Sequence, residues 1–319
     1  MENLALIVAY LVIGWVLQRT RSLPDQSAYV LNQYVIYVSV PALILLHLPK
    51  LNINADVLAP LITPWAMYLL AIGLVLLVSK ALNWSREVTG ALMVVVPLGN
   101  TSFVGFPFVE AFYGVEGLPF AIIYDQTGSF LALALVSTSI AAHYGSTSAA
   151  ATAGKTPPAR LTMKQQVAKL LVFPPVIALL LALAFKAFGI GQNSYPAVVQ
   201  PLLENLAATL VPVVMVAVGL QLRLRIASND RAPFFIALGI KLVVLPMAAL
   251  TVFMLLGINN LAAQVSVFEA AMPPMITGGA IAIAAGLKPR MVAAIIGYGV
   301  LTGMLTLPVM AWIIERVLA

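Results

Sequence analysis

The sequence predicts an all-α membrane protein, in which ten transmembrane helices form two inverted repeats of five helices. Of its 319 residues, 62% are hydrophobic and only 9% are charged, whereas a soluble domain has about 45–50% apolar and about 25% charged residues. Most of the apolar runs are long and show no strand-like alternation, which favours helices over a membrane barrel. This composition excludes collagen, a coiled coil, a disordered chain and a nucleic-acid binder.

The ten spans follow from the length that a membrane helix requires, about 20 mostly apolar residues. The expected spans are residues 3–18, 28–48, 61–79, 88–113, 119–143, 167–188, 197–221, 233–257, 261–286 and 290–314. The stretch between the fifth and sixth spans is polar and rich in Ser, Thr and Ala, which is typical of a linker. The expected organisation is therefore a first repeat (1–144), a cytoplasmic linker (145–166) and a second repeat (167–319).

The basic residues predict the orientation of these spans. Placing the loop after the first span in the cytoplasm puts most of the 17 Lys and Arg residues on that side and leaves Lys50, Lys186 and Arg316 outside. The positive-inside rule then favours both termini outside the cytoplasm, and we expect a multi-pass protein of a bacterial inner membrane. The net charge of +6 is thus explained by topology, and no nucleic-acid partner is expected.

Matching interruptions in the two halves indicate the inverted repeat. A Val-Pro pair occurs in the second span (Val40-Pro41) and again in the seventh (Val211-Pro212). The fourth and ninth spans are interrupted by Gly and Pro, and we pair Pro107 of the fourth with Pro273 and Pro274 of the ninth. Five spans per half is an odd number, so the second half must insert upside down. Interrupted segments at corresponding positions of inverted halves are the best sequence indication of a transporter's binding site.

Interrupted helices indicate a binding site for a physical reason. Proline and glycine leave backbone groups without helical hydrogen bonds, and such groups are costly in hydrocarbon unless they lie within protein or line a water-filled cavity. Two broken spans that cross can bring the partially positive N-termini of half-helices to one point, where an anion is stabilised. Each proline taken singly, such as Pro246 or Pro308, can equally be a simple helix kink without a function.

Polar residues flank both breaks. Asn100 offers donors and acceptors that suit a carboxylate or a hydrated ion, and Thr277 is its approximate counterpart in the second break. Helix capping explains Thr101 and Ser102 about as well as ligand binding does. The expected substrate-binding residues are Asn100, Thr101, Ser102, Gly105, Pro107, Pro273, Pro274 and Thr277.

Five ionisable residues lie within spans, where such groups are functional candidates by default: Glu110, Asp125, Glu204, Lys241 and Glu269. Glu269 precedes the second break by one turn, so it is a candidate for binding a cation or carrying a proton. Asp125 is a second candidate, with an ion pair to Lys241 as the alternative. Glu110 and Glu204 lie near span ends and are expected at solvated edges. The expected ion-coupling residues are Asp125, Glu269 and Lys241, with Na⁺ or H⁺ as the coupling ion.

At these residues the chain resembles the auxin efflux carrier family, which includes bacterial permeases and the plant PIN-FORMED carriers. The motifs are Asn100-Thr101-Ser102-Phe103-Val104-Gly105-Phe106-Pro107, Ala270-Ala271-Met272-Pro273, Thr306-Leu307-Pro308, Asn32 through Pro41, and Gly219-Leu220. One departure is Phe173-Pro174-Pro175, where the plant carriers have Asn-Pro-Asn; its loss of a polar contact puts auxin itself in doubt.

The resemblance implies a scaffold from spans 1, 2, 6 and 7 and a moving transport domain from spans 3–5 and 8–10. It also implies transport of small organic anions by an elevator-like motion, and often a homodimer. The fold is similar to that of bile acid:sodium symporters, whose glutamate before the ninth-span break corresponds to Glu269.

Three functions therefore compete. A secondary or facilitative transporter of small carboxylates explains the paired breaks best. A channel or sensor on a transporter fold is the alternative, although no ring of like charges or filter motif is visible. A membrane-embedded enzyme would need a reactive cluster that the sequence does not offer; with no cysteine and only two histidines, neither a thiolate nor a histidine metal site is expected, nor a cofactor.

Overall fold

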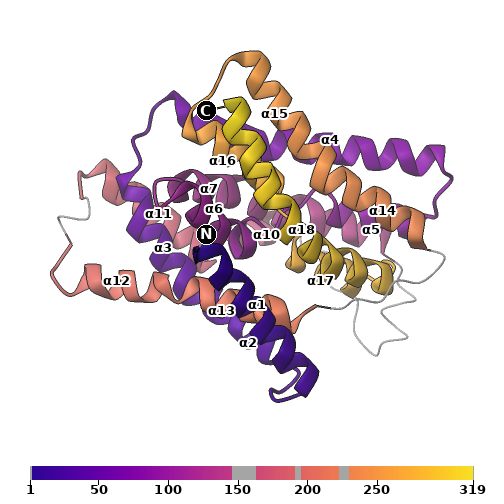
Figure 1. The fold of residues 1–319 in the computed structure, drawn as a ribbon, viewed down its shortest axis with the longest axis horizontal. Coiled ribbons are helices and arrows are strands. Elements are labelled where there is room, and N and C mark those ends of the chain that lie inside the picture. Colours follow the sequence, from indigo (N-terminus) through magenta and orange to yellow (C-terminus); the bar gives the residue numbers. More distant parts are fainter. Residues whose placement is uncertain (1, 146–162, 191–194, 223–229, 319) are drawn as a thin grey trace.

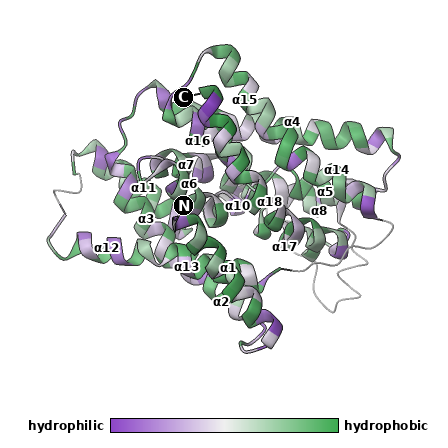
Figure 2. Cartoon of the chain, viewed as in Figure 1, coloured by the Kyte–Doolittle hydropathy of each residue, from purple (hydrophilic) through white to green (hydrophobic). Residues whose placement is uncertain are grey.

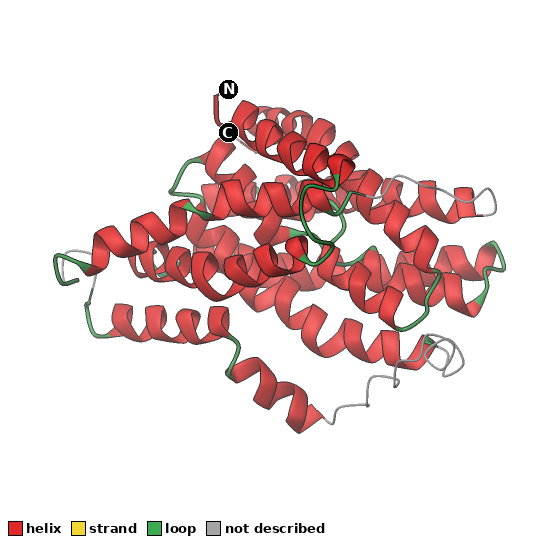
Figure 3. Ribbon diagram, turned by 90° about the horizontal axis from the view of Figure 1, so that it is seen from below, coloured by secondary structure: helices red, strands yellow, loops and turns green. Residues whose placement is uncertain are grey.

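Helices are the only regular elements in the described part of the protein, joined by loops and turns (Figures 1 and 3). The structure is a computed structural model that describes residues 2–145, 163–190, 195–222 and 230–318. In those ranges there is no strand, which agrees with the composition. The stretch predicted as a linker falls mostly outside them, but α10 (Met163–Leu171) already begins within it.

Seven described helical stretches are long and apolar enough to cross a membrane, or eight if the pair α10 and α11 (Pro174–Ala187), bent by 66°, counts as one. The seven are α1 (Glu2–Thr20), α2–η2 (Ser27–Lys50), η3–α4 (Ala55–Ala81), α7–α8 (Leu118–Tyr144), α12–α13 (Val199–Leu220), α14–α15 (Arg231–Leu256) and α18 (Pro289–Leu318). Hydrophobic residues predominate along these helices and hydrophilic residues gather at their ends (Figure 2). Large apolar side chains such as Leu69, Leu77 and Leu255 are exposed, as expected for a surface that faces lipid.

Two further segments are broken in the middle. The first runs through α5 (Arg86–Val95), the turn η4 (Thr101–Gly105) and α6 (Phe106–Tyr113), and the second through α16 (Leu261–Ala270) and α17 (Ile276–Ala284). Each starts on a side-chain cap: Ser85 Oγ accepts from the Val88 amide, and Asn260 Oδ1 accepts from the Ala263 amide. Such caps satisfy amides that lack partners at a helix start.

The first break lies at Gly99 and Asn100, where the sequence predicts it. The helix stops after Val95, so Pro97 is the proline within the break, whereas Pro107 is buried in the first turn of α6. Pro107 thus lies inside the continuous helical stretch Thr101–Tyr113, directly after the π-helical turn η4, and such turns alter the regular backbone hydrogen bonding that a proline interrupts. The prolines within the two breaks are therefore Pro97 in the first and Pro273 and Pro274 in the second.

The helices pack in two groups (Figure 1). In the first group α1 packs along α13 (Leu210–Leu220), and α3 (Val40–His47) packs on α11 and α12 (Val199–Ala208). In the second group α4 (Leu58–Ala81) contacts α16, α5 contacts α8 (Thr138–Tyr144) and α17, and α18 contacts α16 and α17. The contact of α1 with α13 is close because Gly14 and Gly219 let the backbones meet: a Cβ on Gly14 would lie 2.1 Å from the Val216 carbonyl oxygen.

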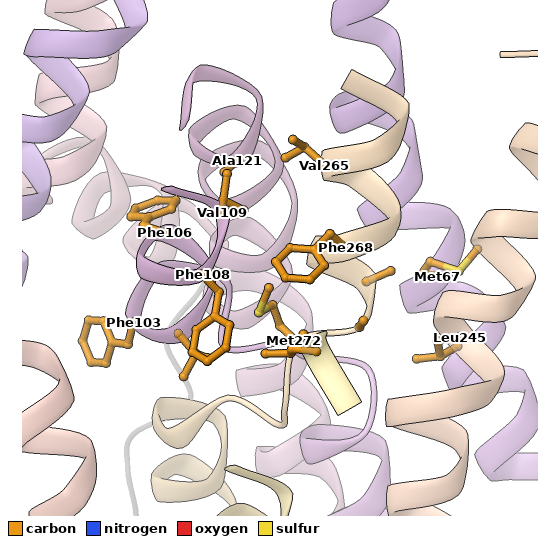
Figure 4. Packing of buried hydrophobic residues seen from close by; sticks show 14 of the residues in the cluster. Met67, Phe103, Phe106, Phe108, Val109, Ala121, Leu245, Val265, Phe268 and Met272 are labelled. Atoms are coloured by element: carbon orange, nitrogen blue, oxygen red, sulfur yellow. The ribbon is translucent and has the colours of Figure 1, made fainter. Parts of the chain in front are cut away.

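Large side chains fill the space around the two breaks. Phe106 and Phe108 of α6, Phe268 of α16 and Met272 of the second break are fully buried and pack in one cluster (Figure 4). This packing surrounds non-helical backbone with protein, as membrane depth requires.

Five π-helical turns interrupt the described helices: η1 (Val35–Ser39), η4, η5 (Tyr124–Ser129), η6 (Ala132–Ser137) and η9 (Ile240–Val244). Such turns are rare and occur frequently at functional sites. Here they carry Thr101, Ser102, Asp125 and Lys241, all of them residues that the sequence singles out.

Candidate functional site

The two breaks cross and are hydrogen-bonded to each other. The Asn100 amide donates to the Pro273 carbonyl (2.8 Å), and the Met275 amide donates to the Leu98 carbonyl (3.0 Å). These bonds form an antiparallel bridge between Gly99 and Pro274. The backbone groups freed by each break are thus partly satisfied by the other, and the contact expected between the broken segments is confirmed.

Small residues of α18 hold this crossing in place. Added Cβ atoms would lie 2.7 Å from Pro274 at Gly299 and 3.1 Å from Pro273 at Gly303. The two prolines therefore pack directly on the backbone of α18.

The crossing brings two half-helix N-termini together. Thr101–Tyr113 starts directly after Asn100, and α17 starts directly after Met275. The first amide groups of a helix have no partner within it and carry partial positive charge. Such a pair of termini is a ready site for an anionic group.

Asp125 joins the first of these N-termini to the helix that follows. It is 1% exposed, and its Oδ1 accepts from Thr101 Oγ1 (2.5 Å) and Ser102 Oγ (2.7 Å). Its Oδ2 accepts from Gln126 Nε2 (2.7 Å). Three donors stabilise a buried carboxylate without a cation. The alternative of an ion pair with Lys241 is not observed, because the ion pair found among the described residues is Lys288 with Asp230, 3.6 Å apart.

A cavity of about 70 Å³ lies beside this network. Asn100, Ser102, Asp125, Gln126, Met275 and Thr277 line it, together with apolar residues of η1, α3, η6 and α11. Asn100 is 3% exposed, and its Nδ2 donor has no partner among the described residues, nor has the Gln126 Oε1 acceptor. A buried polar atom without a partner is costly, so Asn100 and Gln126 each bring one unsatisfied polar atom to the wall of the cavity.

Glu269, near the end of α16 and just before the second break, is a second buried ionisable group. It is 0% exposed, and neither of its carboxylate oxygens has a hydrogen-bond partner within the described ranges. The carboxylate lies over Gly105, where a Cβ would be 2.5 Å from Oε2. Asp125 and Lys241 are the charged groups that act on it, while Lys241 Nζ donates to the Ala270 carbonyl (3.2 Å).

The structure thus distributes the predicted site residues over three positions. Asn100, Ser102, Asp125 and Thr277 line the cavity, although Thr277 is otherwise exposed. Gly105, Glu269 and Lys241 lie near one another and do not line the cavity. Pro107, Pro273 and Pro274 do not line the cavity, and Thr101 contacts it only through Asp125.

Several residues of the cavity wall were not predicted as site residues. The sequence offered an indication for Gln126, since it is a polar residue in an apolar span next to Asp125. The sequence offered no such indication for Phe130, Phe173 and Met275, because an apolar side chain in a span is equally compatible with a core position. Their place depends on how distant helices meet.

Comparison with known proteins assigns the family. The family described as membrane transport protein matches residues 1–311. The chain belongs to this family. It is 28% identical to an uncharacterized transporter of Methanocaldococcus jannaschii over 277 residues, covering 86% of this chain and 85% of that one. It is 26% identical to an uncharacterized transporter of Methanothermobacter thermautotrophicus over 318 residues, covering 96% of each chain. The family membership predicted from the motifs is therefore confirmed, and the protein is a multi-pass membrane transporter.

Proposed function

We propose that this transporter moves small organic anions, of the carboxylate class, across the membrane by elevator-type alternating access. The observation that carries the proposal is the crossing of the two broken segments, which presents two half-helix N-termini and the free Asn100 donor next to a cavity. In a transporter, such discontinuous helices at the interface of repeats form the substrate site.

Ten spans in two inverted repeats are part of this proposal, with each broken segment completing one span. The spacing along the chain supports the repeat: Ser85 and Asn260, which cap the two broken segments, are separated in sequence by the same interval as Gly99 and Pro274 at the crossing. The packing also supports it. The contact of α1 with α13 has its counterpart in the contact of α11 with α3, as an inverted repeat requires of spans 1, 7, 6 and 2.

The two helix groups correspond to a fixed scaffold and a moving transport domain. The cavity lies between them, since Asn100, Asp125 and Thr277 come from the second group and Val40 and Pro175 come from the first. A substrate held by the second helix group would move with that group past the first helix group, as an elevator mechanism requires. In keeping with the charge distribution, we propose both termini outside the cytoplasm, and a homodimer built on the scaffold.

Glu269 is the proposed coupling residue. An ionised carboxylate without hydrogen-bond donors is strongly unfavourable at membrane depth. Glu269 has no hydrogen-bond partner and no ion pair among the described residues, although Lys241 is near enough to act on it. Its charge must therefore be neutralised by H⁺ or Na⁺. Asp125, which already has three donors, supports the first half-helix. Lys241 offsets part of the charge of Glu269 when the coupling ion is absent.

Substrate flux into proteoliposomes tests the proposed site. A panel of small carboxylates is first screened by thermal shift, because a ligand that binds the folded state raises its apparent stability. With a stabilising carboxylate, Asn100→Ala should reduce flux by about tenfold or more, the cost of leaving one polar contact to a charged ligand unmade. Asn205→Ala is the matched control, since Asn205 is exposed on α12. Unchanged flux in Asn100→Ala would contradict the site.

Ion dependence tests the coupling residue. Flux by Glu269→Gln should no longer respond to a sodium or a proton gradient, because the neutral amide needs no counterion. The control is Glu204→Gln, which changes an exposed carboxylate. If Glu269→Gln retains the dependence of the unmodified protein, the assignment is wrong.

A further inference from the structure

A second, larger cavity lies next to the site. It measures about 720 Å³, within the usual range of about 300–1,000 Å³ for ligand pockets, whereas the inner cavity of about 70 Å³ is far below that range. The large cavity is lined by α8, α10 and α17 and includes the exposed side chains of His143 and Lys169. We refer to it as the outer pocket.

Two residues, Phe130 and Phe173, line both the outer pocket and the inner cavity. Their rings are stacked, with centroids 4.5 Å apart and planes 11° from parallel. The stacked pair is therefore the wall between the two cavities.

The rings come from the two different helix groups. Phe130 directly follows the turn η5, which carries Asp125 and contacts α4. Phe173 lies at the bend between α10 and α11, in extended backbone (φ −76°, ψ 126°) directly before Pro174. A residue before proline is disfavoured in helical conformation, which accounts for the extended backbone of Phe173 at the bend. The stack can persist only while the two groups keep their present relation.

We propose that the Phe130–Phe173 pair is a gate, closed in this conformation, that separates the polar inner cavity from the outer pocket. Separation of the rings joins the two cavities into a space large enough for an organic anion. Stacked aromatic rings suit this role because they exclude water and ions while their contact remains weak enough to be broken in each cycle. The gate rests on the proposed function, since it controls access to the proposed substrate site.

Thiol labelling tests the gate without knowledge of the substrate. The sequence contains no cysteine, so single cysteines report one position each. Ser102→Cys probes the inner cavity and Ser139→Cys probes the outer pocket. A bulky, charged maleimide is added to the purified full-length protein in detergent, and labelling rates are compared with and without Phe130→Ala and Phe173→Ala.

We expect slow labelling of Ser102→Cys and an increase of about tenfold when both rings are removed, since an aromatic pair contributes up to about one order of magnitude to the ratio of closed to open states. Labelling of Ser139→Cys should be fast in every background. Phe185→Ala is the matched control: Phe185 lies on the same helix α11 and contacts Tyr195, with ring centroids 6.1 Å apart, away from both cavities.

Equal labelling rates of Ser102→Cys with and without the two rings would overturn the gate, as would an equal increase in Phe185→Ala. A monodisperse elution profile of the double variant shows that it is folded; if it is not, the single variants Phe130→Leu and Phe173→Leu, which keep an apolar residue but remove the stack, give the same comparison. Failure of the gate leaves the flux experiments on Asn100→Ala unaffected, so the two proposals fail separately.

Discussion

The substitution Asp125→Asn tests whether three donors hold a buried, ionised carboxylate at the first half-helix. In the structure, Thr101, Ser102 and Gln126 all donate to Asp125, at 2.5–2.7 Å. Asparagine keeps the shape of the side chain but removes its charge. The Gln126 amide can turn so that its oxygen accepts from the new Nδ2, and the main loss is then that three charge-assisted bonds become neutral bonds.

The expected cost follows from the difference between these two kinds of bond. Hydrogen bonds to charged groups contribute about 1.5–3 kcal/mol and neutral ones about 1 kcal/mol, so three bonds lose about 3 kcal/mol in total. At about 2 °C per kcal/mol for a chain of this size, the apparent melting temperature should fall by about 6 °C.

The assay is thermal unfolding in detergent, followed by the fluorescence of the four tryptophans. Asp25→Asn removes an exposed carboxylate and should change the free energy of unfolding by less than about 0.5 kcal/mol. A double-mutant cycle with Thr101→Val should show coupling, because the two residues share a hydrogen bond. A melting temperature of Asp125→Asn equal to that of the unmodified protein would refute the reasoning, as would strict additivity in the cycle.

Two glycine substitutions test close approaches in the fold. Gly105→Ala places a Cβ 2.5 Å from Glu269 Oε2, so we expect a loss of about 1–3 kcal/mol in stability from overpacking and altered ion dependence of flux. Gly14→Ala places a Cβ 2.1 Å from the Val216 carbonyl oxygen; backbone cannot yield as a side chain does, and we expect a loss of at least about 2 kcal/mol in the same thermal assay. Gly73→Ala, with open space around it, should leave stability nearly unchanged or slightly raised; losses no larger than in this control would contradict both contacts.

The protein class and the two broken segments were predictable, because membrane helices and their interruptions depend on short stretches of sequence. The apolar runs identified a helical membrane protein, and the Gly- and Pro-rich stretches around Asn100 and Met272 identified both broken segments. The motifs around the breaks also indicated the family. The sequence did not decide which proline lies in the first break, since Pro97 and Pro107 both occur in that segment and only the helix boundary at Val95 separates their roles.

Only the tertiary structure decided which side chains meet. The partners of Asp125 are hydroxyl groups on a neighbouring segment, and not Lys241, although both were compatible with its place in a span. The same holds for Phe130 and Phe173, which come from different halves of the chain and stack face to face.

The physical reason is that apolar composition fixes that a segment lies in the membrane but not how it is rotated about its axis. The π-helical turns add to this, because each inserts a residue into the regular period and so turns the residues after it toward another neighbour. These turns carry Ser102, Asp125 and Lys241, so a regular helical period fails where the site is formed. The sequence thus determined the class of protein and the two places where its helices break, and long-range packing determined the crossing, the cavity and the residues that face it.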